Sequence, residues 1–189
     1  MIRPGALLVV GVHREERAFG EVVAAGLDHG LVDVLVIPDG LSGQRPGPHG
    51  HFHYDMLHRA LYLQLLPHMI DRYVLLIDLH TGKHPSGPSA DLICADDALR
   101  AELSAMIDND AVAASHEVRI IALGSGAALH ARTVIPTQVW RNPAFRYLGI
   151  EIYLPDAPHG WLAGERLARR VVTVAAQCLE TAVANAVRA

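Results

Sequence analysis

Short, continuous apolar runs alternate along this chain with segments in which apolar residues recur every three or four positions. Such runs are typical of strands buried on both faces, and they occupy residues 6–12, 31–37, 74–77, 92–95, 118–123 and 148–154. Helical spacing predicts helices over residues 15–27, from about 57 to Pro67, from about 96 onward, and over 161–187. Residues 40–53, rich in glycine, proline and histidine, predict a loop, and between 124 and 146 we expect only a short extended piece at 133–135.

This order of elements indicates the fold class. Strands that alternate with helices predict an α/β fold, in which one mostly parallel mixed sheet carries helices on both faces. The chain has no internal repeat and no break that resembles a linker. Its 189 residues fit one domain, so we expect residues 1–189 to fold as a single unit.

Composition narrows the range of functions. Apolar residues make up 51% of the chain, enough for a real core, and the net charge of −4 gives no electrostatic reason to expect a nucleic-acid partner. The apolar run near the N-terminus is too short for a membrane span or a signal peptide. Cys94 and Cys178 lie far apart in apolar surroundings, which favours buried thiols over a disulfide. We therefore expect a cytoplasmic protein that binds neither membranes nor nucleic acid.

Polar side chains follow two of the predicted strands. His13 and Glu16 come just after the first strand, and Asp78-Leu79-His80 follows the strand at 74–77. Because ligands collect at the carboxyl ends of strands in open α/β sheets, adjacent strands would bring these side chains together. Two imidazoles and one carboxylate, with a fourth position left for water, describe a catalytic zinc site.

Other interpretations of the same residues stay open. His13 alone is equally typical of a capping or packing histidine, and Glu16 of a solvated carboxylate on a helix. Asp78 and His80 share a strand face because side chains alternate along a strand. Asp78 therefore either orients His80 as a metal ligand or forms a structural salt bridge or hydrogen bond.

Three short motifs occur in a suggestive order along the chain: His13-Arg14-Glu15-Glu16, Asp78-Leu79-His80-Thr81-Gly82 and Gly149-Ile150-Glu151-Ile152. Together they resemble the motifs of zinc carboxypeptidase-like amidohydrolases, in particular aspartoacylase and succinylglutamate desuccinylase. The segment Pro88-Ser89-Ala90-Asp91-Leu92-Ile93 is also similar to N-formylglutamate amidohydrolase. The resemblance covers roughly residues 6–155 and implies a zinc carboxypeptidase-like fold.

The resemblance also implies roles for individual residues. His13, Glu16 and His80 match the zinc ligands, and Glu151 matches the residue that acts as general base and then as general acid. Arg141 lies ten residues before Glu151, near where aspartoacylase-type sequences carry a substrate-binding arginine. The chemistry is consistent, because zinc lowers the pKa of its bound water to about 7 and a nearby carboxylate can take the proton.

The chain departs from the family in two places. Arg14-Glu15 stands where the family has Gly-Asn, which puts charge close to the expected metal position. The family also carries an Asn-Arg pair between the first two motifs, which holds the substrate carboxylate or polarises the carbonyl, and this chain has none there. Arg45 or Arg59 could substitute for that pair, although a solvated position suits either one.

The leading hypothesis is a zinc-dependent hydrolase that cleaves an amide bond in a small N-acyl amino acid or short peptide through a metal-bound water. A second is a zinc carboxypeptidase that acts on peptide or cell-wall-derived substrates. A third is a non-catalytic metal-binding or interaction protein on the same scaffold, which the missing Asn-Arg pair favours. The sequence leaves open the acyl group, the oligomeric state and the identity of the metal, because the same ligands accept several divalent ions.

Overall fold

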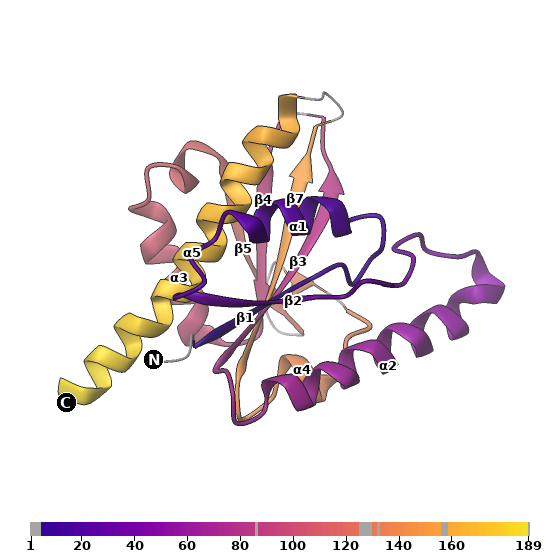
Figure 1. The fold of residues 1–189 in the computed structure, drawn as a ribbon, viewed down its shortest axis with the longest axis horizontal. Coiled ribbons are helices and arrows are strands. Elements are labelled where there is room, and N and C mark those ends of the chain that lie inside the picture. Colours follow the sequence, from indigo (N-terminus) through magenta and orange to yellow (C-terminus); the bar gives the residue numbers. More distant parts are fainter. Residues whose placement is uncertain (1–4, 86, 125–129, 132, 156–158, 189) are drawn as a thin grey trace.

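A seven-stranded sheet forms the centre of the computed structural model, which describes residues 5–85, 87–124, 130–131, 133–155 and 159–188 (Figure 1). Within these residues the strands lie side by side in the order β2 (Val32–Val36), β1 (Ala6–Val10), β3 (Leu75–Lys83), β7 (Arg146–Leu154), β4 (Ser89–Cys94), β5 (Glu117–Leu123) and β6 (His130–Ala131). The first four pair in parallel, β4 runs antiparallel to β7, and β5 and β6 are parallel to β4. The predicted mostly parallel mixed sheet is confirmed.

Helices cover both faces of this sheet. Figure 1 shows α1 (Arg17–Ala25), α3 (Asp97–Asp108) and α5 (His159–Arg188) on one face, and α2 (His51–Met69) and α4 (Thr137–Trp140) on the other. Two short 3-10 helices, η1 (Pro48–Gly50) and η2 (Ala113–Ser115), complete the described helices. The predicted α/β class, with helices on both faces, is therefore confirmed, whereas the single domain over residues 1–189 stays a prediction.

The sequence of β1 explains why a continuous apolar run becomes a central strand. Successive side chains point to opposite faces of a sheet. Leu8 and Val10 pack in the core beneath α1, α3 and α5, while Leu7 and Val9 pack in the core beneath α2 and α4. All four are buried, and each such side chain contributes about 1.5–3 kcal/mol when it leaves water. A strand covered on both faces needs apolar residues at every position.

Strand β3 is longer than its apolar run predicted, and this changes the setting of the second motif. The run at 74–77 ends before Asp78, but residues 78–83 continue the strand because they pair with residues 149–154 of β7. His80 therefore lies within a strand and not just beyond its end, as the sequence analysis expected. Backbone pairing extends the strand here, since the polar side chains supply no apolar signal.

The histidine-rich segment predicted as a loop is partly helical. Residues 48–50 form η1, and α2 begins at His51, inside the predicted loop, and continues through Pro67 to Met69. The spacing predicted that Pro67 ends or kinks the helix, and the helix ends two residues after it. Proline lacks an N–H and disrupts mainly the hydrogen bond to the carbonyl four residues earlier. In the last turn of a helix that loss is tolerated.

The structure also bears on the predictions for residues 133–135, for the two cysteines and for a membrane span. Residues 133–135 belong to no strand; here the N–H of Ile135 donates to Oγ1 of Thr133 and α4 follows shortly afterwards. Cys94 and Cys178 are both buried free thiols, as predicted. Within the described residues no helix combines the length and the apolar character that a membrane span requires.

Asp110 joins η2 to the long helix α5. One carboxylate oxygen accepts the N–H groups of Val112 (3.1 Å) and Ala113 (2.9 Å), and the other accepts the guanidinium of Arg170. The hydrogen bond from Arg170 holds the pKa of Asp110 below its ordinary value. Because the pKa is lower in the folded chain, the stabilisation is present above the unfolded pKa of about 3.9. It is lost as pH falls through the folded-state pKa.

We expect Asp110→Asn to lower the free energy of unfolding by about 1 kcal/mol at pH 7, because Arg170 is partly exposed and water screens the pair. The difference from the unmodified protein should shrink as the pH is lowered below about 4, where the carboxylate becomes protonated. Urea unfolding over a pH series measures this. Asp108→Asn is the control, because Asp108 is exposed at the C-terminal end of α3, two residues before Asp110. A difference that stays constant down to low pH would contradict the assignment.

Candidate metal centre

The turn after β1 brings His13 and Glu16 together. Gly11 has a φ of +82°, and a Cβ at this position would lie 2.6 Å from the carbonyl oxygen of Ile37, so glycine is required. The chain then forms a parallel bridge between His13 and Leu41. The N–H of Glu16 donates to the carbonyl of His13 at 3.1 Å, which directs both side chains to one side of the turn.

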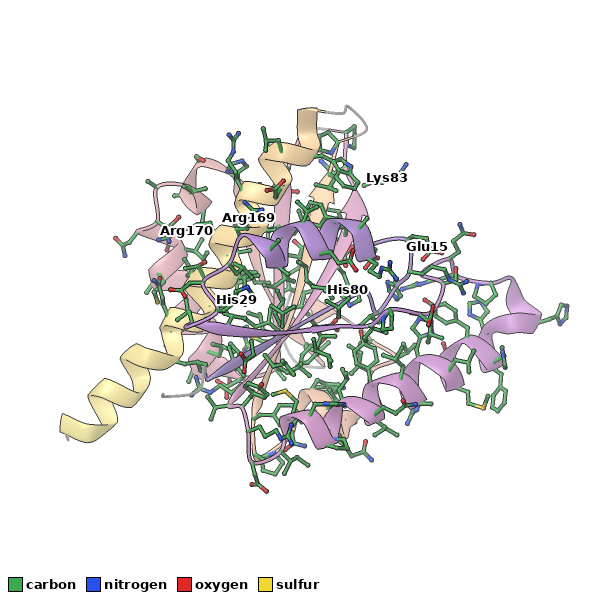
Figure 2. The ribbon with its side chains drawn as sticks, viewed as in Figure 1. Glu15, His29, His80, Lys83, Arg169 and Arg170 are labelled. Carbon is green, nitrogen blue, oxygen red and sulfur yellow. The ribbon has the colours of Figure 1, made fainter. Side chains whose placement is uncertain are left out.

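His80 reaches the same point from β3. Strands β1 and β3 are parallel neighbours, with Val9 opposite Asp78, and His80 follows two residues later on the same face. Figure 2 labels His80 on the sheet and Glu15 on the turn before α1. These two segments are far apart in sequence, and the parallel pairing of their strands makes them neighbours in space.

Three predicted ligands form a compact set. Nδ1 of His13 lies 2.9 Å from one carboxylate oxygen of Glu16, and Nδ1 of His80 lies 2.9 Å from the other. One ligand atom from each residue falls within 4.8 Å of the other two, and the described residues contain no second group of this kind. Two imidazoles and a carboxylate fit a zinc ion with one position open to water. That these residues bind zinc stays a prediction, but the structure brings all three together.

Electrostatics keep the carboxylate of this set ionised. Burial raises the pKa of Glu16, but hydrogen bonds from His13 and His80 outweigh it and hold the pKa below its ordinary value. Burial also lowers the pKa of His80, but the charges and hydrogen bonds of Asp78 and Glu16 together outweigh burial and move that pKa well above its usual value. Metal binding must displace such a proton, so we expect metal affinity to increase with pH.

Asp78 supports His80 from the side away from Glu16. One Asp78 oxygen lies 3.1 Å from Nε2 of His80 in an ion-pair contact, although without the alignment of a good hydrogen bond. The other oxygen accepts the hydroxyls of Tyr62 (2.7 Å) and Tyr147 (2.8 Å). Because Asp78 is fully buried, it needs these partners. The carboxylate favours a proton on Nε2, which leaves Nδ1 available to a metal, so the geometry favours the orienting role.

A cavity of about 460 Å³ lies between the sheet and α2 beside the ligand set. Tyr54, His58 and Tyr62 line it from α2, and they follow one another at four-residue intervals on one helix face. No role was predicted for these residues from the sequence, although the regular four-residue spacing of polar aromatic side chains is a signal for a shared helix face. His58 is buried, and burial lowers the pKa of its imidazole.

Glu151 lines the same cavity from β7. It lies opposite His80 in the register of β3 and β7. Its neighbours Ile150 and Ile152 belong to the core on the other face of the sheet, which leaves the carboxyl group half-buried on the cavity side. Burial raises the pKa of Glu151 to about 7, even though the nearby charge of His80 opposes the shift. A carboxyl group that titrates near neutrality can both accept and return a proton.

Glu15 is one of the two charged residues that depart from the family motif, and its carboxylate is engaged in hydrogen bonds. Glu15 accepts hydrogen bonds from Oγ of Ser42 (2.8 Å) and from the N–H of Gly43 (3.0 Å). These contacts join the turn before α1 to the segment after β2. Hydrogen bonding to Gly43 also lowers the pKa of Glu15. The residue therefore has a structural role here.

The candidate substrate arginines occupy different positions. The guanidinium of Arg141 lies 4.8 Å from the ring centre of Trp140, and Arg141 does not line the described part of the cavity. Arg45 does line it, whereas Arg59 is exposed on α2. The substrate-binding role of Arg141 stays a prediction, and Arg45 is the better placed of the three.

Comparison with solved structures identifies the fold. The CwlD amidase from Clostridioides difficile, solved in complex with the GerS lipoprotein, matches 94% of this chain and 99% of its own, with a TM-score of 0.53 and 9% identity. The catalytic domain of CwlV, an N-acetylmuramoyl-L-alanine amidase from Bacillus (Paenibacillus) polymyxa var. colistinus, matches 96% of this chain and 98% of its own, with a TM-score of 0.53 and 11% identity. This chain shares their fold.

A member of the family named from the motifs is also among the similar structures. Succinylglutamate desuccinylase/aspartoacylase from Rhodobacter sphaeroides is 22% identical and matches 92% of this chain, with a TM-score of 0.48. This chain covers 55% of that longer protein. No protein-family model and no curated protein matches the sequence.

We expect Asp78→Asn to weaken zinc binding by about 10–100-fold, because His80 keeps its ligand atom but loses the charged partner that orients it. Competition against a chromophoric chelator measures the affinity. Asp33→Asn is a matched control, since Asp33 also accepts a tyrosine hydroxyl (2.7 Å from Tyr73) but lies on the edge strand β2. Equal affinities for the unmodified protein and Asp78→Asn would contradict the orienting role.

Proposed function

We propose that this protein is a zinc-dependent hydrolase that cleaves an amide bond in a small N-acyl amino acid or short peptide. The observation that carries the proposal is the position of Glu151, which shares one cavity with His13 and His80 and lies opposite His80 across β3 and β7. Metal-assisted hydrolysis needs a carboxylate beside a metal site with an open position. The fold, shared with N-acetylmuramoyl-L-alanine amidases, is compatible with this chemistry.

In the proposed reaction the metal-holding residues and Glu151 have separate roles. His13, Glu16 and His80 would hold the zinc ion, which would supply a water of lowered pKa and polarise the substrate carbonyl. Glu151 accepts the proton of the attacking water and later donates it to the leaving nitrogen. Its pKa of about 7 suits both steps, because proton transfer is most effective when the pKa lies near the working pH.

The cavity favours a small substrate with a negative charge. Its volume of about 460 Å³ falls within the range typical of small-molecule sites. Arg45 supplies a guanidinium at the cavity wall, and a guanidinium pairs well with a substrate carboxylate. Arg141 keeps the same predicted role from the end of α4.

A peptide or cell-wall-derived substrate is the second candidate. Similarity over almost the whole length to N-acetylmuramoyl-L-alanine amidases favours it. N-acyl amino acids, dipeptides and N-acetylmuramoyl-L-alanine, assayed with zinc and with chelator, separate the two candidates. If the zinc-loaded protein cleaves none of these amides, the non-catalytic alternative is supported.

The identity of the metal needs a separate measurement. Elemental analysis identifies it, since cobalt or manganese can occupy the same ligands. The cytoplasmic location remains a prediction from the sequence.

We expect Glu151→Gln to reduce kcat by about 100-fold or more, because the amide cannot take the proton from water, while bound zinc stays at one equivalent. Steady-state kinetics with the best substrate and metal analysis of the same sample measure both quantities. Glu117→Gln, at an exposed position at the start of β5, is the matched control. Turnover by Glu151→Gln at the rate of the unmodified protein would rule out the assigned role.

A further inference from the structure

The ligand His13 lacks the support that His80 receives from Asp78. Nδ1 of His13 faces Glu16, but within the described residues its Nε2 has no hydrogen-bond partner. If Nδ1 binds a metal, the neutral imidazole carries its proton on Nε2, which is then a donor. Metal-bound histidines almost always donate this second N–H to a fixed partner. Nε2 of His13 therefore requires an acceptor on the cavity wall.

His58 on α2 carries the complementary atom. Its Nδ1 lies 2.8 Å from the carbonyl oxygen of Tyr54, and a carbonyl only accepts, so this nitrogen carries the proton. Nε2 of His58 is therefore a lone-pair acceptor. It is buried and has no partner among the described residues, and the whole residue is only 3% exposed. Most buried side-chain polar atoms have a hydrogen-bond partner, so a donor is expected close to Nε2 of His58.

The two imidazoles lie at a suitable separation. The ring centres of His13 and His58 are 5.4 Å apart, with an angle of 60° between the ring planes. An N–H···N bond between two imidazoles places their ring centres roughly 5 Å apart, because each ring adds about 1 Å to a donor–acceptor distance of roughly 3 Å. The observed separation of the two ring centres is close to this value.

The ring of His58 is held in place by two contacts. The ring of Tyr54 stacks on His58 at 3.9 Å between centres, and the bond to the Tyr54 carbonyl holds the same imidazole from its edge. The ring of His13 packs against Gly43, where a Cβ would come within 3.0 Å of it, so the absence of a side chain at Gly43 allows His13 to lie beside His58.

We propose that His58 is a positioning residue of the metal centre, whose Nε2 accepts the Nε2–H of His13 when Nδ1 of His13 holds the metal. His58 then does for His13 what Asp78 does for His80, with a neutral acceptor in place of a charged one. It is not one of the residues whose ligand atoms lie within 4.8 Å of one another, so we assign its contact to His13 and not to the ion. The inference rests on the metal-dependent function proposed above.

The test compares three variants of the 189-residue chain by zinc competition titration. His58→Leu removes the acceptor and should lower zinc affinity by about 10–100-fold. His58→Gln keeps an acceptor oxygen and should recover most of that loss. His53→Leu, at an exposed position on the same helix, should bind zinc like the unmodified protein. Unchanged affinity in His58→Leu, or no recovery in His58→Gln that folds normally by circular dichroism, would overturn the proposal.

A spectroscopic measurement examines the bond itself. In the zinc-loaded, ¹⁵N-labelled protein we expect a coupling between the Nε2 atoms of His13 and His58 across the hydrogen bond, and its absence in His58→Gln. Lack of this coupling in the unmodified protein would also overturn the proposal. Both measurements are independent of turnover. A protein that binds zinc with the expected dependence on His58 but cleaves no amide would contradict the proposed function alone.

Discussion

The parallel pairing of β3 with β7 is the constraint on which the candidate site depends. Its register places His80 opposite Glu151, and a slip of one residue would turn one of the two side chains to the other face of the sheet. Leu79 and Ile150, the residues next to them in sequence, are buried in the opposite core. Burial of apolar side chains on one face therefore determines where the polar side chains lie on the other.

The composition of helix α2 follows from its two surroundings, the apolar core at one end and the cavity at the other. Near its C-terminal end Leu65 and Met69 pack into the apolar core against the sheet. Nearer its N-terminus the same side carries Tyr54 and His58, which face the cavity, and Tyr62 joins the two regions by bonding Asp78. The helix consequently has no single apolar stripe along its length. A buried carboxylate and an open cavity require polar groups where an ordinary core helix would place leucine.

The departures from the family motifs have different consequences. Glu15 replaces a neutral residue, and its carboxylate accepts hydrogen bonds from Ser42 and Gly43, which join two segments of the chain. The missing Asn-Arg pair leaves substrate recognition to other groups, and Arg45 is the guanidinium that the cavity offers. Asp91, in the segment similar to N-formylglutamate amidohydrolase, is paired with Arg119 at 2.7 and 2.8 Å. Its charge is therefore compensated within the sheet.

The α/β class, the central strands and the three residues that the structure brings together as a possible metal site could be predicted from the sequence alone. Continuous apolar runs report burial on both faces, and the ligands lie at the ends of two such runs. The sequence could not show that β3 continues past His80, because hydrogen bonds to β7 and not apolar side chains extend that strand. Nor could it show that His58 and Tyr62 lie beside the ligand set, since contacts between residues distant in sequence depend on how α2 packs. Those contacts arise from the packing of separate elements, which leaves no local pattern in the chain.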